Sequence, residues 1–160
     1  MANSLSKPIG KSDDSSKEFI IDCLAGNSTG GFDIDSIYYV DSVWYVFEYL
    51  KVENPYVTPH SSHPRRYPWN WRKFYSLWNL TQKLAGKLFL INYSDRKQDS
   101  NEVKVMEVED FDLKKIQDFM SDYKQGNYCD YMKLKERNMT KKEFSEYLIE
   151  LNNRALKSSI

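Results

Sequence analysis

The stretch FDIDSIYYVDSVWYVFEYLKVE, residues 32–53, decides how this chain is expected to fold. Two runs rich in Ile, Val, Tyr, Phe and Trp lie within it, and these residue types favour β-strands. The pair Asp41-Ser42 between the runs is polar and suits a short turn. The pattern therefore predicts two strands joined as a hairpin.

Two acidic residues stand in this hairpin among residues that should otherwise be core. Asp35 lies at the start of the first strand, and Glu48 lies in the second strand with apolar neighbours on both faces. Burying an unpaired carboxylate costs on the order of several kcal/mol, so Glu48 must be paired, metal-bound or at the solvent end of its strand.

Together with Lys51, these acids predict a metal site. Asp35 and Glu48 on adjacent strands provide the oxygen ligands that Mg²⁺ favours. Lys51 could position or help deprotonate an attacking water, or stabilise negative charge on a phosphate. That is the chemistry of phosphodiester hydrolysis. The alternative for Asp33 and Asp35 is that they only cap a turn after Gly30-Gly31.

The remaining segments complete an α/β pattern around the hairpin. Periodicity and turn residues predict helices and strands at both sides of it. The expected elements are a helix over 15–26 capped by Ser15 or Ser16, an irregular loop with four prolines over 54–70, a helix from Trp69 to Gly86, a buried strand over 88–94, a strand nearer an edge over 101–111, a helix over 113–125, and a helix over 140–157 with Thr140 and Glu143 as a capping box.

The segments between residues 15 and 95 resemble the core of the PD-(D/E)XK nuclease superfamily, closest to its restriction-endonuclease-like and nuclease-related branches. The resemblance implies a restriction-endonuclease-like α/β core, a mixed central sheet flanked by helices, with additional C-terminal helices. It also implies that Asp35 and Glu48 bind Mg²⁺ or Mn²⁺, that Lys51 is the catalytic lysine, and that Glu18 is an ancillary metal-binding acid. Glu18 is also the acid that a helix dipole favours in a first turn.

One departure from the family pattern concerns Lys51. The family has Glu-x-Lys, whereas Glu48-Tyr49-Leu50-Lys51 contains one residue more. In a regular strand Lys51 would therefore point to the face opposite Glu48. A bulge would restore the family geometry, and a degenerate, inactive site is the other interpretation.

The charges are unevenly distributed, although 23 Lys and Arg balance 23 Asp and Glu in the 160 residues. No acid occurs between Glu53 and Asp95, where Arg and Lys are interleaved with aromatic residues, a composition suited to phosphate contacts and base stacking. Chance variation in surface charge is the alternative. The candidate nucleic-acid-binding residues are His60, His63, Arg65, Arg66, Tyr67, Trp69, Trp71, Arg72 and Lys73.

Several other classes of protein and site are not indicated. His60 and His63 have no third or fourth ligand nearby, and Cys23 and Cys129 lack metal or disulfide-framework spacing. No phosphate-binding loop, dinucleotide fingerprint, nucleophile elbow or zinc-protease motif occurs. No signal peptide or membrane span is evident, which favours a cytoplasmic protein. We expect a flexible leader over 1–14 and a single domain over 15–160, with its core over 15–112 and C-terminal helices over 113–157.

The sequence thus predicts a metal-dependent nuclease that hydrolyses DNA phosphodiester bonds through a metal-activated water. Dimer formation is possible, as double-strand cutters of this fold often require it. The alternative is a catalytically inactive nuclease-fold module that binds nucleic acid or a protein partner.

Overall fold

The structure, a computed structural model, describes residues 14–158. The chain forms two compact units, and the boundary between them in the sequence lies between Asp33 and Ile34. The N-terminal unit contains helix α1, Ser15–Leu24. Asp14 is its N-cap, in place of the expected Ser15 or Ser16, and the helix ends before Ala25 and Gly26, which have positive φ. The expected flexible leader lies outside the described residues except for Asp14.

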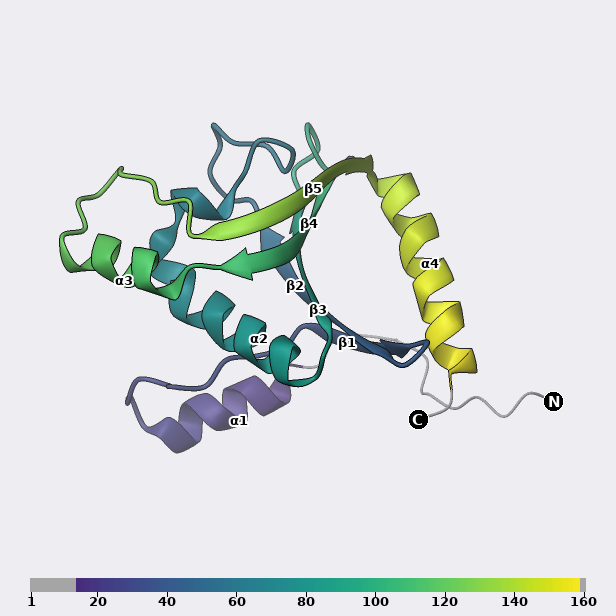
Figure 1. Cartoon of the computed structure of the whole chain (residues 1–160), viewed down its shortest axis with the longest axis horizontal. Helices are drawn as coiled ribbons and strands as arrows, with labels where there is room; N and C mark the ends of the chain where they lie inside the picture. The colour runs from purple at the N-terminus through teal and green to yellow at the C-terminus, as the bar shows by residue number, and fades with distance from the viewer. Residues whose placement is uncertain (1–13, 159–160) are drawn as a thin grey trace. The chain divides into compact units, whose positions relative to one another are not determined.

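The second unit is built on a mixed five-stranded sheet within the described residues, in the order β1-β2-β3-β4-β5 (Figure 1). Neighbouring strands are antiparallel except β2 and β3, which are parallel and therefore need a crossover, supplied by helix α2. The α/β class and the mixed sheet predicted from sequence are confirmed. The elements are β1 Ser36–Val40, β2 Val43–Lys51, two 3₁₀ turns η1 Pro64–Arg66 and η2 Pro68–Asn70, α2 Trp71–Lys83, β3 Lys87–Tyr93, β4 Glu102–Phe111, α3 Leu113–Ser121, β5 Met132–Thr140 and α4 Lys141–Lys157.

The predicted hairpin is present as β1 and β2. Val40 pairs with Val43, and the two residues between them, Asp41 and Ser42, have φ of 50° and 68°. Positive φ at both positions is what a two-residue type I′ turn requires, and its twist matches that of the strands. Arg154 of α4 forms an ion pair with Asp41 and so holds the turn.

The two faces of the sheet carry separate cores because side chains alternate along each strand. Val46, Leu88 and Leu90 pack beneath α2 and α3 in one cluster. Phe47 and Ile91 face α4 in the other cluster. Glu48 follows Phe47 and so lies on the face that α2 covers, which fixes where its carboxylate must find partners.

Strand β4 is nearer an edge of the sheet than β3, as expected, and β5 pairs with it along its whole length. Two other features differ from the sequence analysis. The sequence analysis missed β5 because its exposed positions carry Lys and Arg, as in an edge strand protected against further pairing. The proline-rich loop is not wholly irregular, since Pro64 and Pro68 each begin a 3₁₀ turn, where a missing N–H is tolerated.

Gly86, which follows α2, gives a first testable prediction. A Cβ there would lie 2.7 Å from the backbone oxygen of Trp44, so Gly86→Ala should destabilise the protein by about 1–3 kcal/mol. The midpoint of urea unfolding should fall accordingly. The neighbouring Ala85 has a φ of 50°, so Ala85→Gly should cause no loss and serves as the matched control. An unchanged midpoint for Gly86→Ala would contradict the close approach of these two segments.

Candidate functional site

Glu48 is a carboxylate buried on strand β2, which has a neighbouring strand on each side. It is only 4% exposed. The Nζ of Lys73, on the first turn of α2, lies 2.5 Å from Oε1 of Glu48. The other oxygen, Oε2, is buried and has no hydrogen-bond partner among the described residues. One half of the carboxylate is therefore compensated and the other half is not.

Asp35 approaches the same carboxylate from the adjoining strand. The β1–β2 register pairs Ser36 with Phe47, so Asp35, one residue earlier, stands across from Glu48. Its Oδ2 accepts a hydrogen bond of 2.8 Å from the backbone N–H of Tyr49. The hairpin thus brings the two candidate metal-binding acids together.

The surroundings of Glu48 act on its pKa in opposite directions. Burial raises the pKa above its ordinary value of 4.5, the Lys73 ammonium opposes this rise, and the Asp35 carboxylate adds to it. The net effect is a raised pKa. Asp35 is exposed and Glu48 is buried, and two carboxylates close together have an electrostatic cost that a cation would reduce.

Lys51 does not join Asp35 and Glu48. The β2–β3 ladder runs without a register shift to the Lys51–Tyr93 pair, so no bulge turns the lysine to the Glu48 face. Its Nζ instead lies 2.6 Å from Asp95, which raises the Lys51 pKa. The lysine expected beside Glu48 is supplied by Lys73, which the sequence analysis had assigned to nucleic-acid binding.

Glu18, the expected ancillary acid, is exposed on α1 in the N-terminal unit. Asp35 and Glu48 belong to the second unit. Within residues 14–158 no group of three or more His, Cys, Asp or Glu side chains is placed to hold a metal ion. The candidate metal centre consists of two carboxylates, a set compatible with Mg²⁺, which usually keeps several waters.

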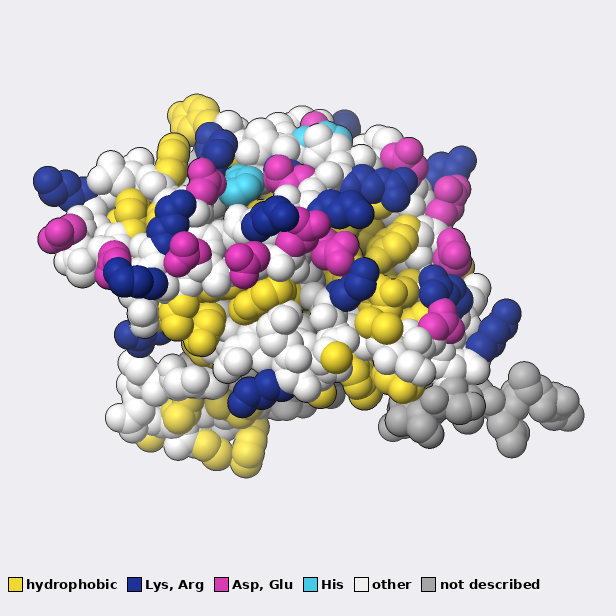
Figure 2. Space-filling view, in the orientation of Figure 1, with side chains coloured by type: hydrophobic (Ala, Val, Ile, Leu, Met, Phe, Trp, Pro, Cys, Tyr) yellow, Lys and Arg dark blue, Asp and Glu magenta, His cyan; other side chains and the backbone are white. Residues whose placement is uncertain are grey.

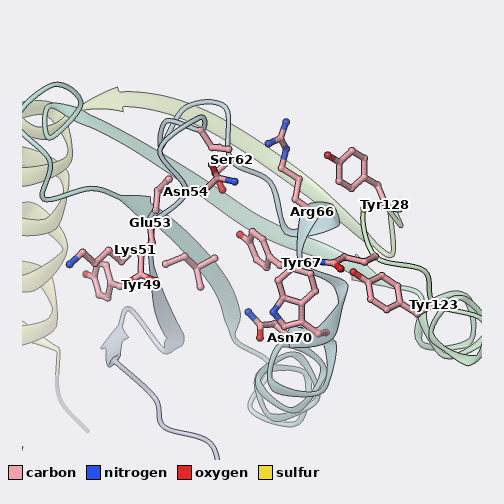
Figure 3. A pocket seen from close by; sticks show the side chains of 16 residues that line it. Tyr49, Lys51, Glu53, Asn54, Ser62, Arg66, Tyr67, Asn70, Tyr123 and Tyr128 are labelled. Carbon is pink, nitrogen blue, oxygen red and sulfur yellow. The ribbon is translucent and has the colours of Figure 1, made fainter.

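A cleft of about 600 Å³ lies beside β2; Asp35, Glu48 and Lys73 are not among its lining residues (Figure 3). Tyr49 and Leu50, which directly follow Glu48, line one side of it, and Asn70, three residues before Lys73, lies on the other. Tyr128, from the segment between α3 and β5, closes the far end beside Arg66. The cleft thus lies beyond the carboxyl end of β2, where open α/β sheets commonly bind ligands.

His60 and His63, two expected nucleic-acid contacts, instead help attach the proline-rich loop. The Nε2 of His60 lies 3.0 Å from the carbonyl oxygen of Met139, and Nδ1 of His63 accepts a hydrogen bond from the backbone N–H of Arg65. Burial lowers the pKa of His63. Both rings therefore already have protein partners, and nucleic-acid contact by either stays a prediction.

Buried polar side chains of the sheet hold the same loop. Nδ2 of Asn92 donates to the carbonyl oxygens of Pro59 and Ser62, at 3.2 and 3.0 Å. Nζ of Lys104 donates to the Ser62 carbonyl and lies 2.6 Å from Glu136. The loop is consequently a fixed wall of the cleft.

The remaining expected nucleic-acid residues are divided. Arg66, Tyr67 and Trp69 line the cleft. Arg65 lies 3.8 Å from Asp130, and the guanidinium of Arg72 sits 5.6 Å from the Trp71 ring, which packs against the core. Nucleic-acid contact by these residues stays a prediction. The cleft is the place where three of them lie together.

Charge on the face of the molecule seen in Figure 2 is mixed, with Lys and Arg side chains beside Asp and Glu. Among the ion pairs of the described residues are Lys133–Glu109 and Lys87–Glu107, at 3.1 and 3.2 Å. This face therefore does not present a continuous basic surface.

Comparisons with known proteins add no relative to this description. No protein-family model matches the chain, and no curated protein or solved structure matches it. None of the helices within residues 14–158 is long and apolar enough to cross a membrane. Function is therefore inferred from the site itself.

The opposing effects on Glu48 give a second prediction. Because the folded pKa lies above 4.5, the folded state binds this proton more tightly, and stability should fall as pH rises between the two values. In ¹³C NMR titrations without metal, Lys73→Met should raise the Glu48 midpoint further and Asp35→Asn should lower it.

Lys83→Met, which changes an exposed lysine at the other end of α2, is the matched control and should leave the midpoint unchanged. Glu48→Gln identifies the resonance. If Lys73→Met titrated like the wild type, the ion pair would have no electrostatic effect on the site.

Proposed function

We propose that the second unit is a Mg²⁺-dependent phosphodiesterase that hydrolyses DNA, with Asp35 and Glu48 as metal-binding acids and Lys73 as the lysine of the site. The supporting observation is the buried Oε2 of Glu48, which lacks a hydrogen-bond partner among the described residues and lies near a second carboxylate. Packing alone gives no reason for this arrangement, whereas a cation would compensate both acids.

The residues present fit a magnesium ion. Asp35 and Glu48 would provide hard oxygen ligands, and water and substrate phosphate oxygens would complete the coordination. When bound, the ion would polarise the phosphate and lower the pKa of a bound water. The backbone N–H of Tyr49 donates a hydrogen bond to Oδ2 of Asp35 and so holds that carboxylate against β2.

Lys73 has two roles in this proposal. Its ammonium favours the ionised form of Glu48, which is the form that binds a metal. It also stands in the first turn of a 13-residue helix that has no acid there, where the helix dipole adds to the attraction for a phosphate. Lys73 can therefore stabilise negative charge that develops on the phosphate during hydrolysis.

Two ion pairs favour the alternative of a catalytically inactive binding module. The ion pair with Lys73 already compensates Oε1 of Glu48, and Lys51 is held by Asp95. A protein of this kind would retain the cleft and lose metal affinity. Calorimetric titration with Mg²⁺ or Mn²⁺ separates the two functions, since only the phosphodiesterase requires binding that Glu48→Gln abolishes.

A cleavage assay tests the proposal directly. Wild-type protein should cut plasmid or single-stranded DNA with Mg²⁺ or Mn²⁺ and not with EDTA. Glu48→Gln, Asp35→Asn and Lys73→Met should each lower the rate by about 100-fold or more, as loss of a charge-stabilising group does. The variants should keep wild-type circular dichroism.

Two further lysine variants make the assay specific. Lys83→Met should retain activity, since its side chain is exposed at the far end of α2. Lys51→Met should lose less than Lys73→Met, because Lys51 is directed at Asp95. Equal rates for wild type and Glu48→Gln would rule out the proposed active site, and the reverse ranking of the lysines would return the catalytic role to Lys51.

A further inference from the structure

The cleft beside the carboxylate site has an unusual lining of aromatic side chains. Trp69 and Tyr128 are each 57% exposed, although such large rings usually lie largely in the core. They come from separate segments, η2 and the connection between α3 and β5, and both line the cleft. Two exposed rings that line one concavity are suited to stacking against planar groups.

Tyr67 provides a rigid base for this lining. Its ring packs edge-on against Phe74 of α2, with centroids 6.2 Å apart, and lies 6.3 Å from the Trp69 ring. Burial raises the pKa of Tyr67 to about 12, so its hydroxyl is neutral at physiological pH. The aromatic wall is thus connected directly to the helix that carries Lys73.

The charges of the cleft are asymmetric. The guanidinium of Arg66 lies 5.7 Å from the centroid of the Tyr128 ring, and no carboxylate among residues 14–158 forms an ion pair with it. Glu53 lies on the opposite side, near Asn54, together with Lys51, whose ammonium is paired with Asp95 (Figure 3). A phosphate is therefore favoured beside Arg66 and disfavoured beside Glu53.

Amide side chains add groups that can recognise a base. Asn54, Asn70 and Gln125 all line the cleft. Each amide carries both a donor and an acceptor, as the hydrogen-bonding edge of a nucleobase requires, and the Oδ1 of Asn54 already accepts a hydrogen bond from the N–H of Tyr56. Exposed rings, an arginine without a carboxylate partner and several amides together match the chemistry of an unpaired nucleotide.

We propose that this cleft binds an unpaired base of DNA, so that single-stranded or frayed ends are the substrate class; the inference rests on the proposed function for its link to cleavage. The base would stack on Trp69 or Tyr128 while its phosphate lies beside Arg66. Cavities of about 300–1,000 Å³ typically enclose small ligands, and a base inside a duplex cannot enter such a space without leaving its stack. Intact duplex would therefore bind less tightly.

Binding measured without metal tests this assignment separately from catalysis. In EDTA, a fluorescent oligodeoxynucleotide should bind at least about tenfold tighter as a single strand than as a duplex of the same sequence. Trp69→Ala and Tyr128→Ala should each weaken single-strand binding by about 5- to 150-fold. A 2-aminopurine placed in the strand should lose fluorescence on binding, and Trp69→Ala should reduce that loss.

Tyr56→Ala is the matched control, because Tyr56 is 94% exposed in the same loop and does not line the cleft. It should bind like the wild type. Arg66→Gln should reduce the salt dependence of binding by about one charge. All variants should unfold at the wild-type temperature, since the altered side chains are exposed.

The outcomes distinguish this inference from the proposed function. Equal affinity for single strand and duplex, or equal losses for Trp69→Ala and Tyr56→Ala, would overturn the assignment of the cleft even if Glu48-dependent cleavage were found. Selective binding of single strands without cleavage of any DNA would support the assignment of the cleft as a base-binding site and overturn the proposed phosphodiesterase function.

Discussion

Burial of the Glu48 carboxylate in the middle of the sheet is the constraint on which the site depends. The Glu48 side chain projects from β2 onto the face that α2 covers, where it is only 4% exposed. Lys73 compensates one oxygen, while the nearby Asp35 increases the negative charge. A core built only for stability would use an apolar residue at this position, because a buried ion pair is often no better than well-packed hydrocarbon. The free-energy cost of burying the Glu48 carboxylate is explained if Glu48 is a catalytic or binding residue.

Other polar residues on the same face of the sheet determine the shape of the cleft. Asn92 and Lys104 are neighbours on β3 and β4, and both donate hydrogen bonds to the backbone of the proline-rich loop. Loops usually lie free at the surface, but this one is attached to the sheet at several points. It therefore holds η1 and η2 in place, and with them Arg66 and Trp69. The buried polar groups of the central strands thus fix both the charged site and the adjoining wall.

Local sequence patterns predicted the hairpin, helix α2, the buried strand β3 and the capping box of α4 (Thr140 with Glu143), because each follows from periodicity or from a short-range motif. They did not predict β5, because its charged residues lack the alternating apolar pattern of a strand. This segment is a strand because it pairs with β4. The approach of Asp35 to Glu48 follows from the hairpin register. The partner of Glu48 could not be found in this way, because Lys73 reaches it only through the packing of α2 on the sheet.

Strand spacing determines where Lys51 points, whereas the packing of α2 on the sheet determines that Lys73 reaches Glu48. Three residues after Glu48, a regular strand directs Lys51 to the α4 side, and the unbroken β2–β3 ladder leaves no bulge to reverse it. A lysine for Glu48 must then come from the element that covers its face, which is α2. Pro68 begins the 3₁₀ turn that leads directly into this helix and so sets where its first turn, with Lys73, falls. Because the same loop carries Arg66 and Trp69, one segment positions both the lysine of the charged site and the wall of the cleft.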